Sequence, residues 1–407
     1  MNQIALSTEA LPHWVMPDFA GDPYPHYHLL RAASPVYRLP IGFWIVTRYK
    51  DISNLFKDPR FARDYSYDMH RTYGPGAFDE PLFDAMRRMM LFLEPPDHPR
   101  VRSLVAKAFS ARRIEDLRPT IRTIVKDLLD QMQARAQFDL VGTFAAELPI
   151  RIIAHLMGLT SAEYARMTQP FRFAGRMLDL MPMSRAELDD GNRLIGNFKD
   201  AFKDALDMRR ASPRDDLITH LMQVQETGDR LSHDELTANI ILLFVAGYET
   251  TSNLIGNAVL ALLSHPAELA RVRNDGVITQ NAVDELLRYD TPVQFTGRTV
   301  MEDLVFEGED LRKGDFVVAC LGAGNRDPDA FDRPDELNLL REGVRPLSFG
   351  GGIHFCLGAQ LAKIESEIAL SMLFERFPKL RLSGSEPFRW KPGFVVRGLQ
   401  FLHVEHV

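Results

Sequence analysis

Hydrophobic residues recur with the period of an α-helix along most of the chain and alternate as in a β-strand in only a few short stretches. The longest helical pattern covers about residues 234–264 and is apolar on nearly every side. It begins at a capping box, Ser232 to Glu235, and ends before Pro266. This pattern predicts a buried helix about 45 Å long that crosses the whole domain. We therefore expect a mainly α-helical fold with a small β region.

The other patterns are shorter. Strand-like patterns lie at residues 36–39 and 43–47, at 291–298, 305–306 and 316–320, and at 392–402. The first pair predicts a hairpin, the middle group a small sheet, and the last a further hairpin. Helical patterns lie at residues 27–33, 49–57, 114–129, 148–157 and 357–377.

Two segments are expected to cover a binding site. Residues 60–92 show no clear period but are rich in tyrosine, methionine and phenylalanine, which is typical of a functional loop. Residues 164–202 predict two helices with a break near 180–184, and the methionines near the break suit an adaptable lid. No linker, repeat or low-complexity run divides the chain, so we expect one domain over residues 1–407.

Composition excludes several classes of protein. The chain has 407 residues, 45% of them hydrophobic, and a net charge of −7, which argues against general nucleic-acid binding. Two cysteines, Cys320 and Cys356, are too few for a disulfide framework and favour a reducing compartment. The sequence shows neither a signal-peptide pattern nor an apolar run of about 18 residues. We therefore expect a cytoplasmic protein without a membrane anchor.

The strongest chemical signal is the glycine-rich loop 349–358, Phe-Gly-Gly-Gly-Ile-His-Phe-Cys-Leu-Gly. Its Cys356 stands at the start of a predicted helix, where unpaired N–H groups and the helix dipole favour a thiolate. Glycines let another group approach the backbone closely. A lone cysteine is usually a small buried residue, as we expect for Cys320. Such a residue does not need glycines around it, so the loop is expected to present Cys356 to a flat ligand.

The middle of the long helix breaks two local rules at once. Gly247 costs about 1 kcal/mol relative to alanine in a helix interior, and Glu249 is an acid inside a buried helix. Thr250 follows directly, and an acid beside an alcohol can transfer protons. A structural alternative is a kink at which Thr250 bonds back to the helix backbone. Two violations together favour a functional site.

These motifs resemble those of the cytochrome P450 family. The loop fills the haem-binding pattern Phe-Gly-x-Gly-x-His-x-Cys-x-Gly that starts at Phe349, and the helix fills Ala-Gly-x-(Asp/Glu)-Thr-Thr. The resemblance implies the cytochrome P450 fold, with haem b between the helix and the loop and Cys356 as the axial thiolate ligand of the iron, a ligand that favours O–O cleavage. It also implies that Gly247 makes room for dioxygen and that Thr250 and Glu249 control proton delivery.

The resemblance assigns further residues to the cofactor and to folding. It places four side chains on the haem propionates, whose charges cannot lie unpaired in the interior: His98, Arg102, Arg298 and His354. Taken alone, the first two are also typical of a solvated helix face, and His354 of a loop hydrogen bond. Glu285 and Arg288 alone are typical of a surface ion pair. The resemblance makes them a buried pair that supports the thiolate loop.

The activity implied is that of a soluble bacterial monooxygenase of secondary metabolism. One atom of O2 enters a largely apolar small molecule by hydroxylation or epoxidation, with electrons from NAD(P)H through a reductase and a ferredoxin or flavodoxin-type donor. The donor is expected on a basic patch, although the same residues also suit an ordinary solvated face: Arg100, Lys107, Arg112 and Arg113. The substrate pocket is expected to include Met86, Met89, Phe92, Met177, Ile241, Phe244, Val245, Phe295 and Val395.

Two other functions are compatible with a haem-thiolate loop. A peroxygenase would take its oxygen from peroxide, but the presence of both Glu249 and Thr250 argues against it. A non-catalytic haem sensor or binding protein would need a partner-binding or DNA-binding segment, and no such segment is visible in the sequence.

Overall fold

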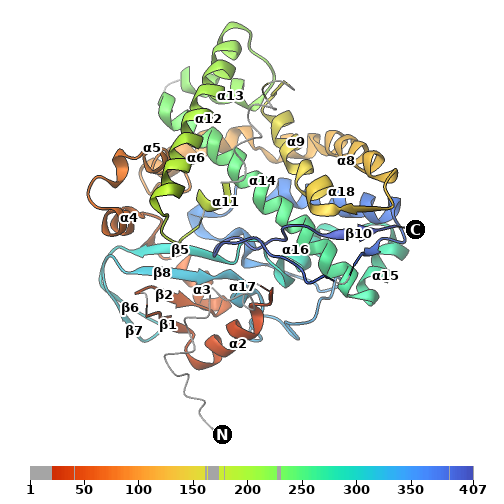
Figure 1. Ribbon diagram of the computed structural model, residues 1–407. Helices are drawn as coiled ribbons and strands as arrows, with labels where there is room; N and C mark the ends of the chain where they lie inside the picture. The colour runs from red at the N-terminus through yellow and green to blue at the C-terminus, as the bar shows by residue number, and fades with distance from the viewer. Residues whose placement is uncertain are drawn as a thin grey trace.

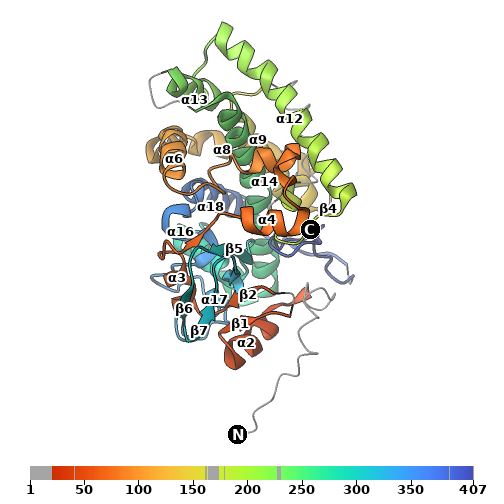
Figure 2. The same ribbon diagram turned by 90° about the vertical axis from the view of Figure 1, so that its left-hand side faces the viewer.

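The computed structural model describes residues 21–40, 42–160, 163, 174–177, 179–226, 231–384 and 386–406. Figures 1 and 2 show a sheet-rich part beside a larger helical part, and α14 (His233–Ser264) runs through the middle of the helices. The expectation of a mainly α-helical fold with a small β region is confirmed.

The main sheet has five strands in the order β1-β2-β8-β5-β3. Strands β1 and β2 form the predicted hairpin, with Val36 opposite Val46, and β2 continues in parallel with β8. A second sheet has the order β4-β10-β9, and β6 pairs with β7 alone. The strands are β1 (Val36–Arg38), β2 (Trp44–Val46), β3 (Phe61–Ala62), β4 (Gln137–Asp139), β5 (Phe295–Val300), β6 (Leu304–Phe306), β7 (Glu309–Leu311), β8 (Phe316–Cys320), β9 (Arg381–Leu382) and β10 (His403–Glu405).

The helical part is built around α14. The predicted capping box is present, because Ser232 Oγ accepts from the Glu235 backbone and the Glu235 carboxylate accepts from the Ser232 backbone. Most side chains of α14 are buried, and it packs against α9, α16 and α18. The other helices are α2 (Tyr24–Ala33), α3 (Tyr49–Leu55), α4 (Ser66–Tyr73), α5 (Pro81–Met86), α6 (Asp97–Ala108), α7 (Ala111–Asp116), α8 (Arg118–Gln133), α9 (Glu147–Leu156), α11 (Ala174–Met177), α12 (Arg185–Ala211), α13 (Leu217–Glu226), α15 (Pro266–Asp275), α16 (Gln280–Tyr289), α17 (Leu321–Asn325) and α18 (Ala359–Arg376), with the short 3-10 helices η3 (Ala77–Asp79), η6 (Leu347–Phe349) and η7 (Gly352–His354) and the π-helix η4 (Val141–Ala145).

Two strand predictions need correction. Residues 305–306 do not extend the main sheet, because the chain reverses at Glu307 and Gly308, both with positive φ, and β6 pairs back onto β7. Residues 392–402 form no regular strands, although the chain reverses there as predicted: Lys391 N–H donates to the Gly398 carbonyl and Gln400 N–H donates to the Arg389 carbonyl, each at 2.8 Å. Only isolated bridges appear there, Val293 to Val396 and Trp390 to Leu399.

Two helix predictions also need correction. Residues 60–92 are not one irregular loop but contain β3, α4, η3 and α5, helices too short to show a clear period in the sequence. The pattern at 114–129 is divided into α7 and α8, because Pro119 begins a new helix. Of the two helices expected at 164–202, the second is α12, which starts at a capping box on Ser184, and most of the first lies outside the described residues.

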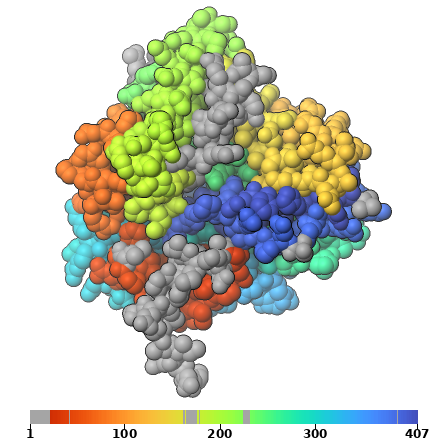
Figure 3. All heavy atoms as spheres, in the orientation of Figure 1, coloured from red at the N-terminus to blue at the C-terminus, as the bar shows by residue number. Residues whose placement is uncertain are grey.

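The segment after α18 runs across the middle of one face, where it is blue in Figure 3. On that face it lies between the beginning of α12 and the N-terminal elements. It contributes Val395 and Val396 to an internal cavity. Within the described residues, no helix has the length and hydrophobicity required to cross a lipid bilayer.

Candidate active site

The two predicted motifs face each other across one cavity of about 260 Å³, here called the Cys356 cavity. The central helix contributes Gly247 and Thr250, and the glycine-rich loop contributes Phe349 and Cys356. The remaining wall is mostly apolar, from α9 and α18 among others. A ligand here would lie between the middle of α14 and the cysteine, as expected from the sequence.

Backbone constraints set the shape of the loop. The N–H of Cys356 donates to the carbonyl of Phe349 at 2.9 Å, which closes the turn. Gly350 and Gly352 adopt φ of 69° and 63°, in the left-handed region that favours glycine. A Cβ on Gly352 would lie 2.0 Å from the carbonyl oxygen of Phe56, so no other residue fits there. The loop is therefore held in place against the segment after α3.

Cys356 presents its accessible surface to the cavity that it lines. Burial raises the pKa of its thiol, although the N–H groups of Gly358 and Ala359 and the charge of Arg102 act in the opposite direction. The N–H groups at the start of the helix thus act in the predicted direction, towards the thiolate, but desolvation is the larger effect. A coordinated cation would reverse this, since a metal-bound thiol loses its proton.

Three arginines, Arg63, Arg102 and Arg298, bring positive charge to the cavity wall, and the last two bond backbone carbonyls. Arg102 donates to the Phe355 carbonyl at 2.6 Å, and Arg298 donates to the Gly297 carbonyl at 2.7 Å. No described carboxylate forms an ion pair with Arg298, and burial, reinforced by the charge of Arg63, lowers its pKa to about 9. A buried guanidinium without an anion is unfavourable. This end of the cavity is therefore suited to an anionic ligand group.

The two predicted histidines lie together beside these arginines. Their ring centroids are 4.4 Å apart, and His98 Nε2 is buried with no partner within the described part of the chain. His354 Nε2 lies 3.0 Å from Glu94 Oε1, and burial lowers the pKa of His354 to about 4. His354 is thus neutral at pH 7, and its Nε2 already has a hydrogen-bond partner in the carboxylate of Glu94. His98 keeps a free ring nitrogen for a further partner.

These features fit the haem that the sequence implies. A single thiol faces the cavity, and no group of three His, Cys, Asp or Glu residues in the described ranges could hold a bare metal ion. The iron would therefore depend on Cys356 and on the porphyrin nitrogens. Arg298, Arg102 and the unpartnered His98 suit the two propionates.

Thr250 lies on the cavity wall, and its hydroxyl donates to the Ala246 carbonyl at 2.7 Å. The backbone bond considered as a structural alternative is therefore present. Gly247 also lines the cavity, but a Cβ there would lie 2.5 Å from Ile153 Cδ1. A side chain at this position would therefore displace the end of the Ile153 side chain of α9.

Glu249 lines neither described cavity and turns towards the C-terminal segment. Its Oε1 lies 3.7 Å from Lys391 Nζ, which also donates to Asn253 Oδ1 at 2.9 Å. Burial raises the pKa of Glu249, although Lys391 opposes this shift. The adjacent residues Glu249 and Thr250 thus point into different surroundings.

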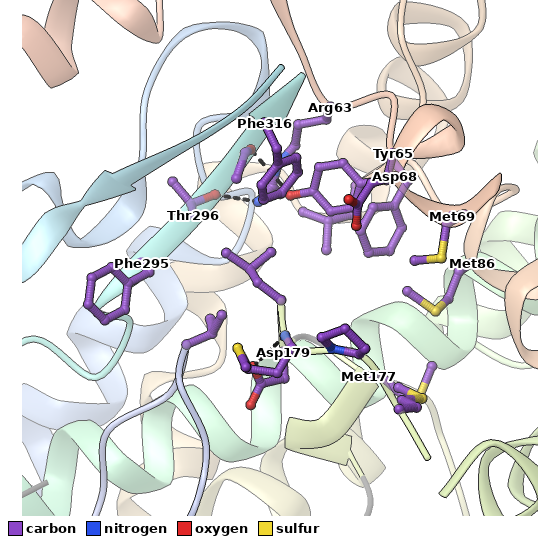
Figure 4. Close-up of a pocket in the computed structure, with 18 of the residues that line it drawn as sticks. Arg63, Tyr65, Asp68, Met69, Met86, Met177, Asp179, Phe295, Thr296 and Phe316 are labelled. Carbon is purple, nitrogen blue, oxygen red and sulfur yellow. Dashed lines mark hydrogen bonds between the residues drawn. The ribbon is translucent and has the colours of Figure 1, made fainter. Parts of the chain in front are cut away.

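A second cavity of about 190 Å³ adjoins the first and shares five of its wall residues, Arg63, Leu91, Ala246, Val293 and Thr296. Figure 4 shows Met69, Met86 and Met177 pointing into it. Met181 and Met183 also line it, and we call it the methionine cavity. Five of the nine predicted substrate residues line its wall: Met86, Phe92, Met177, Phe295 and Val395.

The other four predicted substrate residues line neither of these two cavities: Met89, Ile241, Phe244 and Val245. They are buried in the apolar core instead. Phe244 packs edge-on against Phe198 and Phe202 of α12. The residues of α14 that line the two cavities recur at helical spacing: Leu242, Leu243, Ala246, Gly247, Thr250, Thr251 and Leu254. Met89 and Val245 line a smaller third cavity together with Met86, Phe92 and Met177. The substrate role of the four residues stays a prediction.

Glu285 and Arg288 form a fully buried pair, with both side chains 0% exposed and Oε2 to Nε at 2.7 Å. Arg288 also donates to the Asn325 carbonyl, and Asn325 bonds Ser348 Oγ and the Leu347 N–H. The network thus ends at the residues that precede the glycine-rich loop. The structural role expected for this pair is supported, and the surface alternative is wrong.

The basic patch is narrower than expected. Arg100 pairs with Asp97 at 2.9 Å and with Glu235 at 2.5 Å, so its charge is neutralised. Arg113 bonds His220 at 2.9 Å. Lys107 and Arg112 are exposed. Any docking of an acidic partner would depend mainly on these two.

Sequence reasoning missed Glu365, a carboxyl of α18 that lines the Cys356 cavity. It is fully buried, Oε2 has no partner within the described residues, and burial raises its pKa to about 8. The rule applied to Glu249, an acid within a buried helix, could have found it. Arg63 and Lys391 were also missed, because nothing local marks them.

Replacing Glu365 by glutamine is expected to remove a pH-dependent loss of stability. Its folded pKa of about 8 exceeds the ordinary value of 4.5, so folding favours the neutral acid. Its stabilising contribution is complete below about pH 4.5 and declines as pH rises to about 8, on the order of a few kcal/mol in total. Urea midpoints from pH 5 to 9 should fall less steeply for Glu365→Gln. The exposed Glu375→Gln should follow the wild type, and equal slopes in all three proteins would contradict the prediction.

Comparison with known proteins agrees with this geometry. The family model for Cytochrome P450 matches residues 42–397. The putative cytochrome P450 133B1 of Xylella fastidiosa (strain 9a5c) is 39% identical over 389 residues, covering 96% of this chain and 97% of that protein. Polyketide biosynthesis cytochrome P450 PksS of Bacillus subtilis (strain 168) is 35% identical over 401 residues, covering 95% and 96%.

Solved structures show the same fold. Myxobacterial cytochrome P450 CYP267B1 in complex with myristic acid has a TM-score of 0.89 at 37% identity, covering 98% of this chain and 100% of that one. P450BioI in complex with acyl carrier protein ligated to hexadec-9Z-enoic acid has a TM-score of 0.88 at 34% identity, covering 96% and 100%.

Proposed function

The chain belongs to the cytochrome P450 family, and from this premise we propose that it hydroxylates or epoxidises a largely apolar small molecule with electrons from a ferredoxin or flavodoxin-type donor. Enzymes of this family are monooxygenases that use haem b and obtain electrons from NAD(P)H through redox partners. The observation that supports the substrate class is the methionine cavity, whose largely apolar wall adjoins the cavity of Cys356.

The Cys356 cavity would bind the haem, and the methionine cavity would bind the substrate. Cys356 would bind the iron, and His98, Arg102 and Arg298 would hold the propionates. When bound, the haem supplies the iron centre at which dioxygen is reduced and one oxygen atom is transferred. The apolar wall of the methionine cavity would orient the substrate and exclude water.

Proton delivery is assigned to Thr250 and Glu249. Because the Thr250 hydroxyl donates to Ala246, its oxygen can still accept a hydrogen bond from a water in the cavity. Burial raises the pKa of Glu249, and the carboxyl group is therefore a better proton donor near neutral pH. The Glu249 side chain would have to break its contact with Lys391 and rotate before it could donate a proton on the side of α14 that lines the cavity.

Thr250→Ala should preserve substrate binding but divert electrons from product formation to the formation of hydrogen peroxide. Without the hydroxyl, protons reach the reacting oxygen less selectively, so we expect product per NADPH to fall by roughly tenfold and hydrogen peroxide to rise. Parallel assays of NADPH, peroxide and product measure this. Thr250→Ser keeps the hydroxyl and should retain most of the coupling. Unchanged coupling in the alanine variant would remove Thr250 from the proton path.

The electron donor is proposed to dock beside α6 and α7, where Lys107 and Arg112 are exposed. α6 also carries Arg102, which bonds the loop at Phe355. A donor on this surface would therefore lie close to the loop of Cys356. Because salt screens the attraction between exposed charges, the affinity of the donor for this surface should fall as ionic strength rises.

The substrate class can be tested on the ferric protein. Fatty acids, terpenoids, steroids and polyketides are titrated in turn while the Soret band is followed, and compounds that shift it are then incubated with NADPH, reductase and ferredoxin. A blue shift and an oxygenated product for one class would establish the activity. Turnover with peroxide alone, unaffected by Thr250→Ala, would indicate a peroxygenase instead. Neither shift nor product with any class, in haem-loaded protein, would favour a non-catalytic binding protein.

A further inference from the structure

Arg63 stands in the wall between the two cavities. It directly follows β3, whose pairing with β5 fixes the backbone. Its side chain lines both the Cys356 cavity and the methionine cavity. Figure 4 shows Arg63 on the side of Thr296, across the methionine cavity from Met177. Nη2 donates to Thr296 Oγ1 at 2.5 Å, which aims the guanidinium along the wall.

The protein supplies no anion for this guanidinium. Nε is buried without a hydrogen-bond partner, and no carboxylate in the described part of the chain forms an ion pair with Arg63. After burial, the charge of Arg63 is a further cause of the lowered pKa of Arg298 and of His354. Arg63 as a whole is half-buried, and a cation that is partly withdrawn from water without a counterion is unfavourable. The site is therefore complete only when a ligand brings negative charge.

Arg63 differs from the arginines assigned to the haem propionates. Arg102 and Arg298 line the Cys356 cavity alone, whereas Arg63 is the one cationic side chain of the described residues that also lines the methionine cavity. Two acids line that cavity, but both have partners: Asp68 pairs with Arg71, and Asp179 accepts from the backbone N–H of Phe394 at 2.9 Å. A negatively charged ligand in this cavity would therefore meet Arg63.

The rest of the cavity wall indicates that the part of the ligand away from its negative charge is apolar. Met69, Met86 and Met177 are unbranched and flexible, so they pack against a hydrocarbon chain in many positions. We propose that Arg63 binds the carboxylate of a fatty-acid substrate whose chain lies along these methionines. This inference rests on the proposed monooxygenase function and names its substrate class.

The test compares two ligands of equal chain length in four haem-loaded proteins. Dissociation constants for dodecanoic acid and 1-dodecanol are measured by calorimetry and by the Soret shift. The proteins are the wild type, Arg63→Met, Arg63→Lys and the control Arg122→Met, an exposed arginine of α8. Haem content is determined for each protein, because Arg63 also lines the Cys356 cavity.

We expect the wild type and Arg122→Met to bind the acid at least about tenfold more tightly than the alcohol, as a charge-assisted hydrogen bond predicts. Arg63→Met should lose this preference with little change in affinity for the alcohol, and Arg63→Lys should keep part of it. Equal binding of acid and alcohol by the wild type, or an intact preference in Arg63→Met, would overturn the inference.

Two further outcomes separate the inference from the proposed function. If Arg63→Met loses haem while its preference for the acid stays, Arg63 serves the cofactor and the inference is wrong. If the alcohol shifts the Soret band and is oxygenated with NADPH but the acid has no advantage, the monooxygenase function stands and the inference alone fails. If neither ligand binds or reacts and the whole substrate panel is inert, both fail.

Discussion

Cys356→Ala is expected to abolish turnover and the red-shifted Soret band of the reduced carbon monoxide complex. Cys356 is the one thiol that faces the cavity below α14, since Cys320 is fully buried in β8. The arginines and His98 would remain, so haem can still enter the cavity without a thiolate ligand. Absorbance spectra of the reduced protein with carbon monoxide, together with product assays, measure the effect.

The matched control is Cys320→Ala, which removes the other cysteine. Its thiol packs with Tyr27 and Phe295, so a small loss of stability is expected but an unchanged spectrum. Circular dichroism establishes that both variants are folded. A thiolate-type band that survives in folded Cys356→Ala would show that the ligand assignment is wrong.

Arg288→Ala is expected to cost up to about 3–5 kcal/mol of folding free energy, because it removes the fully buried cation that pairs with Glu285. The less buried Arg341, 3.2 Å from Glu285 Oε2, is then the only cation paired with this carboxylate among the described residues. The side chains of Glu285 and Arg288 are 0% exposed, and Arg288 also binds the carbonyls of Asn325, Pro334 and Glu336. The damage should reach the haem loop, since Asn325 holds Leu347 and Ser348. Urea unfolding and haem content measure the two effects.

Arg210→Ala provides the control for this pair. Arg210 and Asp207 have the same spacing along the chain and a 2.7 Å contact, but their side chains are 52% and 55% exposed. Exposed pairs contribute little, so the change should stay within about 1 kcal/mol. Similar losses in both variants would mean that burial is not what makes Glu285 and Arg288 important.

Much of the fold and of the site was predictable because its signals are local. The glycine-rich loop and the motif on α14 each lie within ten consecutive residues, and the positive φ of Gly350 and Gly352 is a property of the residue type. The capping box at Ser232 and the buried pattern after it predicted α14 to within one residue. Short helices between residues 60 and 92 were not predictable, since they are stabilised by packing rather than by their own pattern.

The sequence by itself determined which chemical groups are present and which of them are neighbours along a helix or a loop. It did not determine which side of α14 meets the cavity. The helical period says that Leu243, Gly247 and Thr250 share a face, but only packing of α12 on the opposite side shows that Phe244 lies in the core.

Tertiary structure also decided the partners of the charged groups. Glu249 pairs with Lys391, and Glu94 bonds His354. The backbone N–H of Arg63 donates to Glu94, but no acid in the described part of the chain pairs with the Arg63 guanidinium. These outcomes depend on segments far apart in the sequence, whose approach is set by the packing of the whole domain. Because the electrostatics of a buried group depends on what surrounds it in space, the free cation of Arg63 became visible only in the folded protein.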